Sequence, residues 1–403
     1  MKSPLLRTSI FLLLAATALA NPARAEEVPP VVAAIFKNWE GQLKATPAYD
    51  KIETDGSGNV TISNLAATIG AEDPTTKVKL SIGSITLENV AAEANGVIGV
   101  GAATFNDTKA EIAGPDNKTI VVEVPRSTVE DWYVAVAGDN PTPLQALRAN
   151  MGIARKMTSG EIKVTAEGQT FTAKGIESAW DGDPVTGAGK TTMSFNEIVI
   201  PEAALAMADP SGQLKAMGYS DLTLNIAGDG EFTVNDTSFG MSGSFGISGK
   251  DMAGIKFSYG AGEIPLAVMS ELRAAQAAGR PPDFNMLMPQ LMNVSLNGLQ
   301  VRFEDASITK KLLPLIAKMQ GVEEAAMVAS AGAMMQISLM QLKNQAFTDQ
   351  VVGAVNAFLK DPKSLTITLK PAAPVKVQQL MALDPANPGA AVDVLGASVT
   401  AND

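Results

Sequence analysis

The sequence contains neither cysteine nor histidine among its 403 residues. Without cysteine there is no disulfide framework, and without histidine there is no Ser-His-Asp triad, no imidazole general base and none of the usual zinc sites. These absences favour a non-enzymatic protein that has no cofactor. A chain of this length can instead hold itself together by burying most of its apolar surface.

Aromatic residues are also scarce, at 5% of the chain, and the formal net charge is -11. No run of basic residues interrupts this acidic balance. Because an acidic surface repels phosphate backbones, we expect no nucleic-acid partner. Attraction to an anionic membrane is disfavoured for the same reason.

Residues 187–192 read GAGKTT and look like the end of a phosphate-binding P-loop. A P-loop needs a glycine five positions before its Gly-Lys pair, a strand in front and a helix behind. Here Pro184 holds the glycine position, and residues 193–200 alternate as a strand does. The sequence therefore predicts a β-turn followed by a strand, and no nucleotide ligand.

The first 25 residues have the three-part plan of a secretory signal peptide. Lys2 and Arg7 precede an apolar stretch, and Ala23 and Ala25 provide small residues before Glu26. The apolar stretch is shorter than the ~20 residues that a membrane span requires. We expect cleavage after residue 25 and a location in the periplasm of a Gram-negative bacterium.

The pattern of apolar and polar residues changes along the remaining chain. Residues 26–158 are expected to form an N-terminal helix, over residues 31–44, and a β-rich half. Residues 159–403 are expected to form a second β-rich half followed by helices, continuous with the first as one elongated unit. The pattern predicts an α+β fold with a large, curved, predominantly antiparallel sheet, packed helices and a helix-rich C-terminal third.

Two further signals concern local structure within residues 26–158. Ser127 to Glu130 have the spacing of a helix capping box, S-x-x-E. Residues 141–157 read as a helix that proline opens. Both signals predict helical structure after the first set of strands.

A weak internal repeat joins residues 80–87, 193–200 and 294–301, at spacings of 113 and 101 residues, with a fainter copy at 60–65. In each copy, two apolar positions lie three positions apart, as in Ile82-x-x-Ile85. Because faces alternate along a strand, a three-residue step changes the apolar side unless a β-bulge or bend intervenes. The alternative is a chance similarity among β-rich segments.

Ser307 and Lys310 spell S-x-x-K, the nucleophile motif of serine-lysine hydrolases. The K-T-G triplet that accompanies it elsewhere is missing, because Thr192 follows Lys190-Thr191. Ser307 also stands where a strand gives way to a helix, and we expect it to act as a helix N-cap.

Residues 325–342 form an 18-residue run without a charge and contain four methionines. Alanine, serine and glycine dilute its hydrophobicity, so burial against a sheet or a neighbouring helix is expected rather than a membrane span. Methionine adapts to ligands of irregular shape. The candidate ligand contacts are Met327, Met334 and Met335 in this run, with Phe36 and Trp39 in the N-terminal helix.

The segments LNGLQVRFEDASITKKLLPLIAKMQG and FLKDPKSLTITLKPAAPVKVQQLMAL resemble the C-terminal region of uncharacterised secreted proteins from alphaproteobacteria. The strand units SITLENV and SFNEIVI are similar to those of AsmA-like envelope proteins. That resemblance implies a sheet that forms an apolar groove, and it implies no catalytic residue. Because residues 1–25 have the pattern of a cleaved signal peptide, we expect no retained N-terminal membrane anchor of the kind usual in AsmA-like proteins.

These observations converge on a non-enzymatic periplasmic protein that binds an apolar or lipid-like ligand in a groove, or that supports envelope maintenance. One alternative is a structural module that binds an envelope protein partner. A serine-lysine hydrolase is the other alternative.

Overall fold

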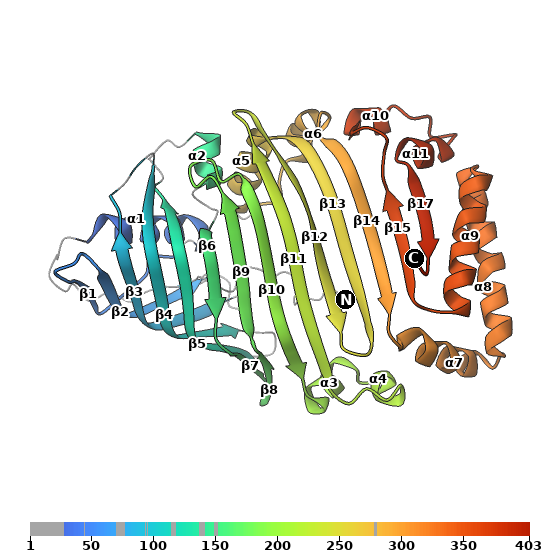
Figure 1. Ribbon diagram of the computed structural model, residues 1–403, viewed down its shortest axis with the longest axis horizontal. Helices are drawn as coiled ribbons and strands as arrows, with labels where there is room; N and C mark the ends of the chain where they lie inside the picture. Colours follow the sequence, from blue (N-terminus) through green and yellow to red (C-terminus); the bar gives the residue numbers. More distant parts are fainter. Residues whose placement is uncertain are drawn as a thin grey trace. The chain divides into compact units, whose positions relative to one another are not determined.

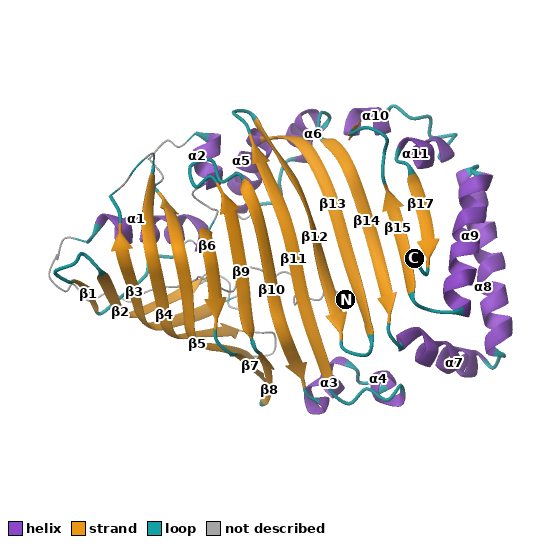
Figure 2. Cartoon of the chain, viewed as in Figure 1, coloured by secondary structure: helices purple, strands orange, loops and turns teal. Residues whose placement is uncertain are grey.

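The computed structural model describes residues 28–43, 45–69, 77–92, 94, 96–113, 118–136, 142–148, 152–277 and 280–403. Within these ranges, the strands belong to one antiparallel sheet and most helices follow residue 265 (Figure 1, Figure 2). The expected α+β class and the helix-rich C-terminal third are therefore confirmed. The predicted signal peptide lies outside the described residues and stays a prediction.

The chain divides into two compact units. The first comprises residues 1–187 and 195–204, and the second comprises residues 188–194 and 205–403. The division that we expected after residue 158 falls inside the first unit, at the end of a strand. Each unit contains both strands and helices.

The first unit is built on an antiparallel meander. Its strands are β1 (Lys51–Thr54), β2 (Val60–Ile69), β3 (Val78–Val90), β4 (Val97–Ala113), β5 (Thr119–Ala135), β6 (Ile153–Ser159), β7 (Ile162–Ala166), β8 (Gln169–Ala173), β9 (Gly175–Gly182) and the C-terminal half of β10 (Gly189–Ile200). From β1 to β5, each strand pairs with the next. β5 then pairs with β6 over one part of its length and with β7 over another.

Helix α1 (Pro30–Leu43) packs on the apolar face of this meander and confirms the predicted N-terminal helix. Val32, Ile35 and Trp39 recur at helical spacing and are at most 4% exposed. The sheet residues beneath them are equally buried. They include Ile62, Leu65, Ile82, Ile85 and Leu87. The core of the first unit therefore lies between α1 and one face of the sheet.

Three strands of the first unit bend at aligned positions. Asn64 in β2 and Asp107 in β4 have positive φ angles of 51° and 53°. Gly83 in β3 lies opposite both of them in the strand register. A Cβ atom on Gly83 would lie 3.2 Å from the Cβ of Asp107, so the smallest residue suits this crowded position. We call Asn64, Gly83 and Asp107 the first bend row.

A second bend row crosses β3, β4 and β5 in the same way. Asn89 and Asp131 have φ angles of 54° and 47°, and Gly101 lies opposite both. A Cβ atom on Gly101 would lie 3.0 Å from the Cβ of Asn89. A residue with left-handed backbone interrupts the regular pleat of its strand. Paired strands stay hydrogen-bonded only if they bend at the same place, so the bends of neighbouring strands coincide.

These bends explain the three-residue steps of the repeat. In β3, Leu80 and Ile82 are buried, and so are Ile85 and Leu87, although regular alternation would send the second pair to the opposite face. The other copies are irregular at one of the two residues between the apolar positions, namely Asn64 in β2, Glu197 in β10 and Asn297 in β14. The predicted bulge or bend is therefore confirmed in each copy.

One expectation for the first unit is wrong, and another holds only in part. Ser127–Glu130 lies within β5, where Ser127 and Val129 are buried with the period of a strand. β5 pairs with β4 along its whole length, and this pairing overrides the local capping signal. The helix expected over residues 141–157 is limited, in the described residues, to α2 (Pro143–Arg148), and β6 takes the residues from Ile153.

The second unit contains another antiparallel meander. Its complete strands are β11 (Leu222–Val234), β12 (Ser238–Gly249), β13 (Ala253–Pro265), β14 (Ser295–Asp305), β15 (Ser364–Leu369), β16 (Val375–Lys376) and β17 (Ala397–Ala401). From β11 to β14, each strand pairs with the next. β14 also pairs with β15 and β16, and β15 pairs with β17.

Helices surround the strands of the second unit. They are α4 (Gln213–Ala216), α5 (Leu266–Ala277), α6 (Phe284–Leu291), α7 (Ile308–Gln320), α8 (Glu324–Leu339) with its 3-10 extension η3 (Met340–Leu342), α9 (Gln345–Lys360), α10 (Val377–Met381) and α11 (Gly389–Val394), while α3 (Glu202–Ala208) spans the division between the units. α9 packs on β15 and β17, and α8 packs on α9. The ring of Phe358 in α9 meets Phe303 of β14 edge-on, at 5.9 Å.

Candidate functional site

Large apolar side chains lie on one face of four neighbouring strands in the second unit. They are Met241 in β12, Phe257 and Tyr259 in β13, Leu299 in β14 and Ile367 in β15, and we call them the apolar strip. Each of these residues is between 37% and 48% exposed. Exposed apolar residues that form a contiguous patch mark surfaces that bind something.

The strand register makes the apolar strip continuous. Tyr259 lies directly opposite Leu299. Phe257 lies opposite Val301, which lies opposite Ile367 on the next strand. Side chains that face each other across antiparallel strands have Cβ atoms about 4.5–5.5 Å apart. The strip therefore crosses the strands without a polar interruption.

Alternation along the strands puts these residues on one face. β13 reads Lys256-Phe257-Ser258-Tyr259, so its polar and apolar side chains point to opposite sides. Met241 pairs with Ala261, two residues beyond Tyr259, and belongs to the same face. The local sequence thus specifies one apolar and one polar face for this part of the sheet.

The polar face is occupied by a hydrogen-bonded cluster at the last residue of the chain. Arg302 Nη1 donates to Asp403 Oδ1 at 2.8 Å and to Thr366 Oγ1 at 2.9 Å. The Thr400 hydroxyl donates to the other carboxylate oxygen of Asp403. These bonds, from Thr400 first and then from Arg302, lower the pKa of Asp403 to about 2. The polar side chains of this face therefore form hydrogen bonds with one another.

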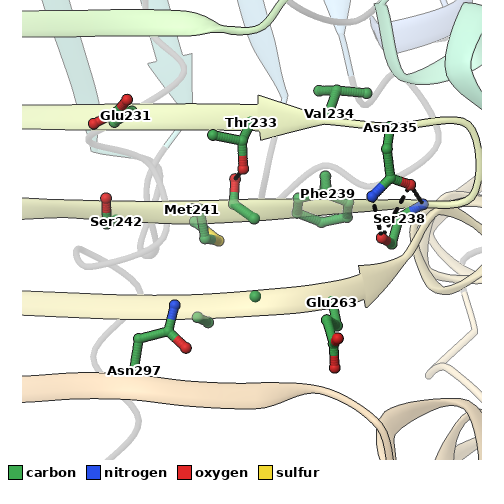
Figure 3. Close-up of a pocket in the computed structure, with 13 residues that line it drawn as sticks. Glu231, Thr233, Val234, Asn235, Ser238, Phe239, Met241, Ser242, Glu263 and Asn297 are labelled. Atoms are coloured by element: carbon green, nitrogen blue, oxygen red, sulfur yellow. Dashed lines mark hydrogen bonds between the residues drawn. The ribbon is translucent and has the colours of Figure 1, made fainter. Parts of the chain in front are cut away.

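A hollow of about 380 Å³ lies among β11 to β14 at the end that carries the β11–β12 turn (Figure 3). Its polar side chains already serve the local structure. Glu263 pairs with Lys376 at 3.0 Å, and the Asn235 side chain accepts from the backbone N–H groups of Thr237 and Ser238. No group of three or more potential metal ligands occurs among the described residues. We therefore regard the apolar strip as the better candidate site.

The structure places the sequence-derived ligand candidates in two different units. Trp39 is 4% exposed in the core of the first unit, and Phe36 packs against it with a ring separation of 6.0 Å. Met327, Met334 and Met335 all lie on α8 of the second unit. None of the five belongs to the apolar strip. The alternation in β13 was the available signal for the strip, but alternation does not reveal whether a face is covered.

Helix α8 differs from expectation. The charge-free run does form a helix, but Gly332 is its one buried residue. Met334 is 69% exposed, and Met327 and Met335 are half-buried. By length and composition alone, Glu324–Leu342 is the single described helix that meets the requirements of a membrane span. The expected burial of this run is wrong because α8 packs mainly on α9, which leaves its other sides open.

Ser307 is engaged in structural hydrogen bonds. Its hydroxyl donates to the backbone carbonyl of Asp251 at 2.6 Å and lies 2.8 Å from the hydroxyl of buried Tyr219. The ammonium of Lys311, not of Lys310, stands over the Tyr219 ring at 3.8 Å. Ser307 holds the N-cap position of α7 but makes no side-chain capping bond, and Asp305 instead accepts from the Thr309 N–H. This geometry gives no support to a Ser307–Lys310 nucleophile.

The P-loop lookalike also has a structural explanation. The Gly187 N–H donates to the Asp183 carbonyl and closes a turn, and Gly187 has a φ angle of 82°. β10 begins at Gly189 and takes in Lys190 to Thr192. No helix follows to present its N-terminus to a phosphate, so the predicted turn and strand are confirmed.

Comparison with known proteins adds one finding. A family model described as "Uncharacterized protein" matches residues 246–402. That segment contains β13 to β15 with four of the five strip residues, and it also contains α8. No curated protein and no solved structure gives a significant match.

Proposed function

We propose that the protein binds an apolar, lipid-like ligand on the apolar strip after export to the periplasm. The observation that carries this proposal is the half-exposed row of large apolar side chains on β12 to β15. Export rests on the signal-peptide pattern of residues 1–25. The similarity of the strand units to AsmA-like envelope proteins is consistent with such a role.

The dimensions of the strip suit an extended hydrocarbon chain. β12 to β15 span three inter-strand spacings, or roughly 14 Å. Each methylene group that leaves water contributes about 0.8 kcal/mol, so even partial coverage of an acyl chain is favourable. Phe257 and Tyr259 offer flat rings, and Met241 offers a flexible thioether that adapts to an irregular chain. The strip has no charged group, so it selects for apolarity rather than for a headgroup.

The proposal can be tested by native mass spectrometry of the exported protein, with its denatured mass for comparison and with extraction of lipid. We expect extra mass in the range of a lipid, which denaturation removes. We also expect uptake of a fluorescent fatty acid. Repeated recovery of the protein without lipid, together with no uptake of the fatty acid, would contradict the proposal.

A pair of variants localises the binding. Phe257→Asn combined with Ile367→Asn should weaken fatty-acid binding at least tenfold. Lys256→Asn places the same new residue beside Phe257 on the opposite, polar face, and it should bind as the parent protein does. Equal loss in both variants would show that binding depends on the stability of β13 and not on the strip.

A further inference from the structure

Helix α8 exposes an apolar side that no described element covers. Met334 is 69% exposed, Ile337 is 68% exposed and Met340, in η3, is 65% exposed. They follow one another at three-residue steps, so they are neighbours on the helix surface. Such exposure is costly in water for side chains that normally occupy interiors.

The opposite side of α8 is committed to α9. A Cβ atom on Gly332 would lie 2.8 Å from Oδ1 of Asn356, which shows how closely the two helices approach. Since Gly332 is the one buried residue of α8, α9 covers a single narrow side. The outward side with Met334 and Ile337 is therefore free for another contact.

The two serine hydroxyls of α8 form hydrogen bonds inside the helix. The Ser330 hydroxyl donates to the carbonyl of Met327 at 2.8 Å, and the Ser338 hydroxyl donates to that of Met334 at 2.9 Å. Residues 325–342 carry no charge. A hydroxyl group in hydrocarbon must find its partner within the helix, and these two have done so. The surface offers a protein partner no ion pair that would set specificity.

We propose that α8 docks on a lipid bilayer, with Met334, Ile337 and Met340 in the acyl-chain region. The helix and its extension comprise 19 residues, about 28 Å at 1.5 Å per residue. Because α9 holds one side, α8 lies against the membrane rather than crossing it. With a net charge of -11, the protein should favour zwitterionic over anionic lipid. This inference rests on α8 alone and is independent of the apolar strip.

The test is flotation of the full chain with phosphatidylcholine vesicles. Met334→Lys combined with Ile337→Lys should lower the bound fraction at least tenfold. The matched control is Phe284→Lys combined with Met286→Lys, which adds the same charge at residues of α6 that are 64% and 59% exposed. The control should bind within twofold of the parent protein. Any contribution from elsewhere in the chain is shared by all variants.

A second measurement reports the environment of α8 directly. The chain has no cysteine, so Met334→Cys or, as a control, Met381→Cys in α10 can carry a single polarity-sensitive fluorophore. Vesicles should shift the emission to the blue at position 334 and leave position 381 unchanged. The apolar-strip variant Phe257→Asn with Ile367→Asn should still float, which separates failure of this inference from failure of the proposed function.

Three outcomes would overturn the inference. The parent protein could fail to float, or the control variant could lose binding as fully as the α8 variant. The third outcome is a parent protein that sediments as a dimer, does not float and becomes a monomer in the α8 variant. In that case, a second copy of the chain, and not a bilayer, covers α8.

Discussion

In the first unit, helix α1 lies over the apolar face of the sheet, whereas in the second unit the residues of the apolar strip are half exposed. Ile85 in β3 is 1% exposed, and Ile367 in β15 is 48% exposed. Both are isoleucines in antiparallel strands whose side chains alternate between faces. Alternation therefore decides which face is apolar, while a covering element decides whether that face becomes a core.

The largest expected effect comes from a matched pair of substitutions in this comparison. Ile85→Ala should lower the free energy of unfolding by about 2–5 kcal/mol, because it leaves a cavity in a packed core. Ile367→Ala should cost less than about 1 kcal/mol, since its side chain is half solvated. Urea denaturation of both variants measures the difference. Equal costs would mean that the strip is buried in solution and would contradict the comparison.

The tryptophans make this measurement specific to one unit. The chain has three, at positions 39, 132 and 180, and all of them belong to the first unit. Tryptophan fluorescence therefore follows the unfolding of the first unit, while far-ultraviolet circular dichroism follows both units. Ile85→Ala should shift the fluorescence transition, and Ile367→Ala should leave it in place.

A smaller effect is expected at the second bend row. Asp131→Val should destabilise the first unit by about 1–2 kcal/mol, because a β-branched residue is strained at a φ angle of 47°. Asp131→Gly should be close to neutral, since glycine adopts this conformation without strain. Thermal unfolding followed by tryptophan fluorescence distinguishes them. A valine variant as stable as the glycine variant would contradict the left-handed conformation.

The smallest effect concerns pH and the second unit. The pKa of Asp403 is about 2 in the folded protein, below the ~3.9 of an unperturbed aspartate. Its hydrogen bonds therefore stabilise the fold above about pH 4, and this contribution is lost as the pH falls towards 2. Because the side chain of Asp403 is 47% exposed, the contribution should stay below about 1 kcal/mol.

Asp403→Asn is the variant that tests this linkage. Between pH 5 and pH 2, its melting temperature, followed by circular dichroism, should fall less than that of the parent protein. Asp236→Asn, at the exposed turn between β11 and β12, should follow the parent protein. If Asp403→Asn showed the same pH dependence as the parent protein, the Arg302–Asp403 pair would not be the cause of the loss of stability at low pH.

The sequence predicted the fold class and most long helices because periodicity reports local structure directly. The same reasoning failed at Ser127–Glu130, where pairing with β4 outweighed a capping pattern. It also failed for α8, because an apolar composition predicts burial but does not say which neighbour provides it. The apolar strip was missed for a related reason. Its residues come from four strands, and only the register of those strands brings Phe257, Tyr259 and Ile367 to one surface.

The bend rows have a consequence for how the strands of the first unit find their partners. If β3 slipped by one residue along β2 and β4, Gly83 would leave its row, and Ile82 or Ser84 would enter the crowded position. The same slip would turn the apolar side chains of β3 away from α1. A shifted register is therefore destabilised in two ways: by steric crowding at the bend row and by exposure of the apolar side chains of β3 to water. The bend rows therefore favour the native strand register over shifted registers while the sheet forms.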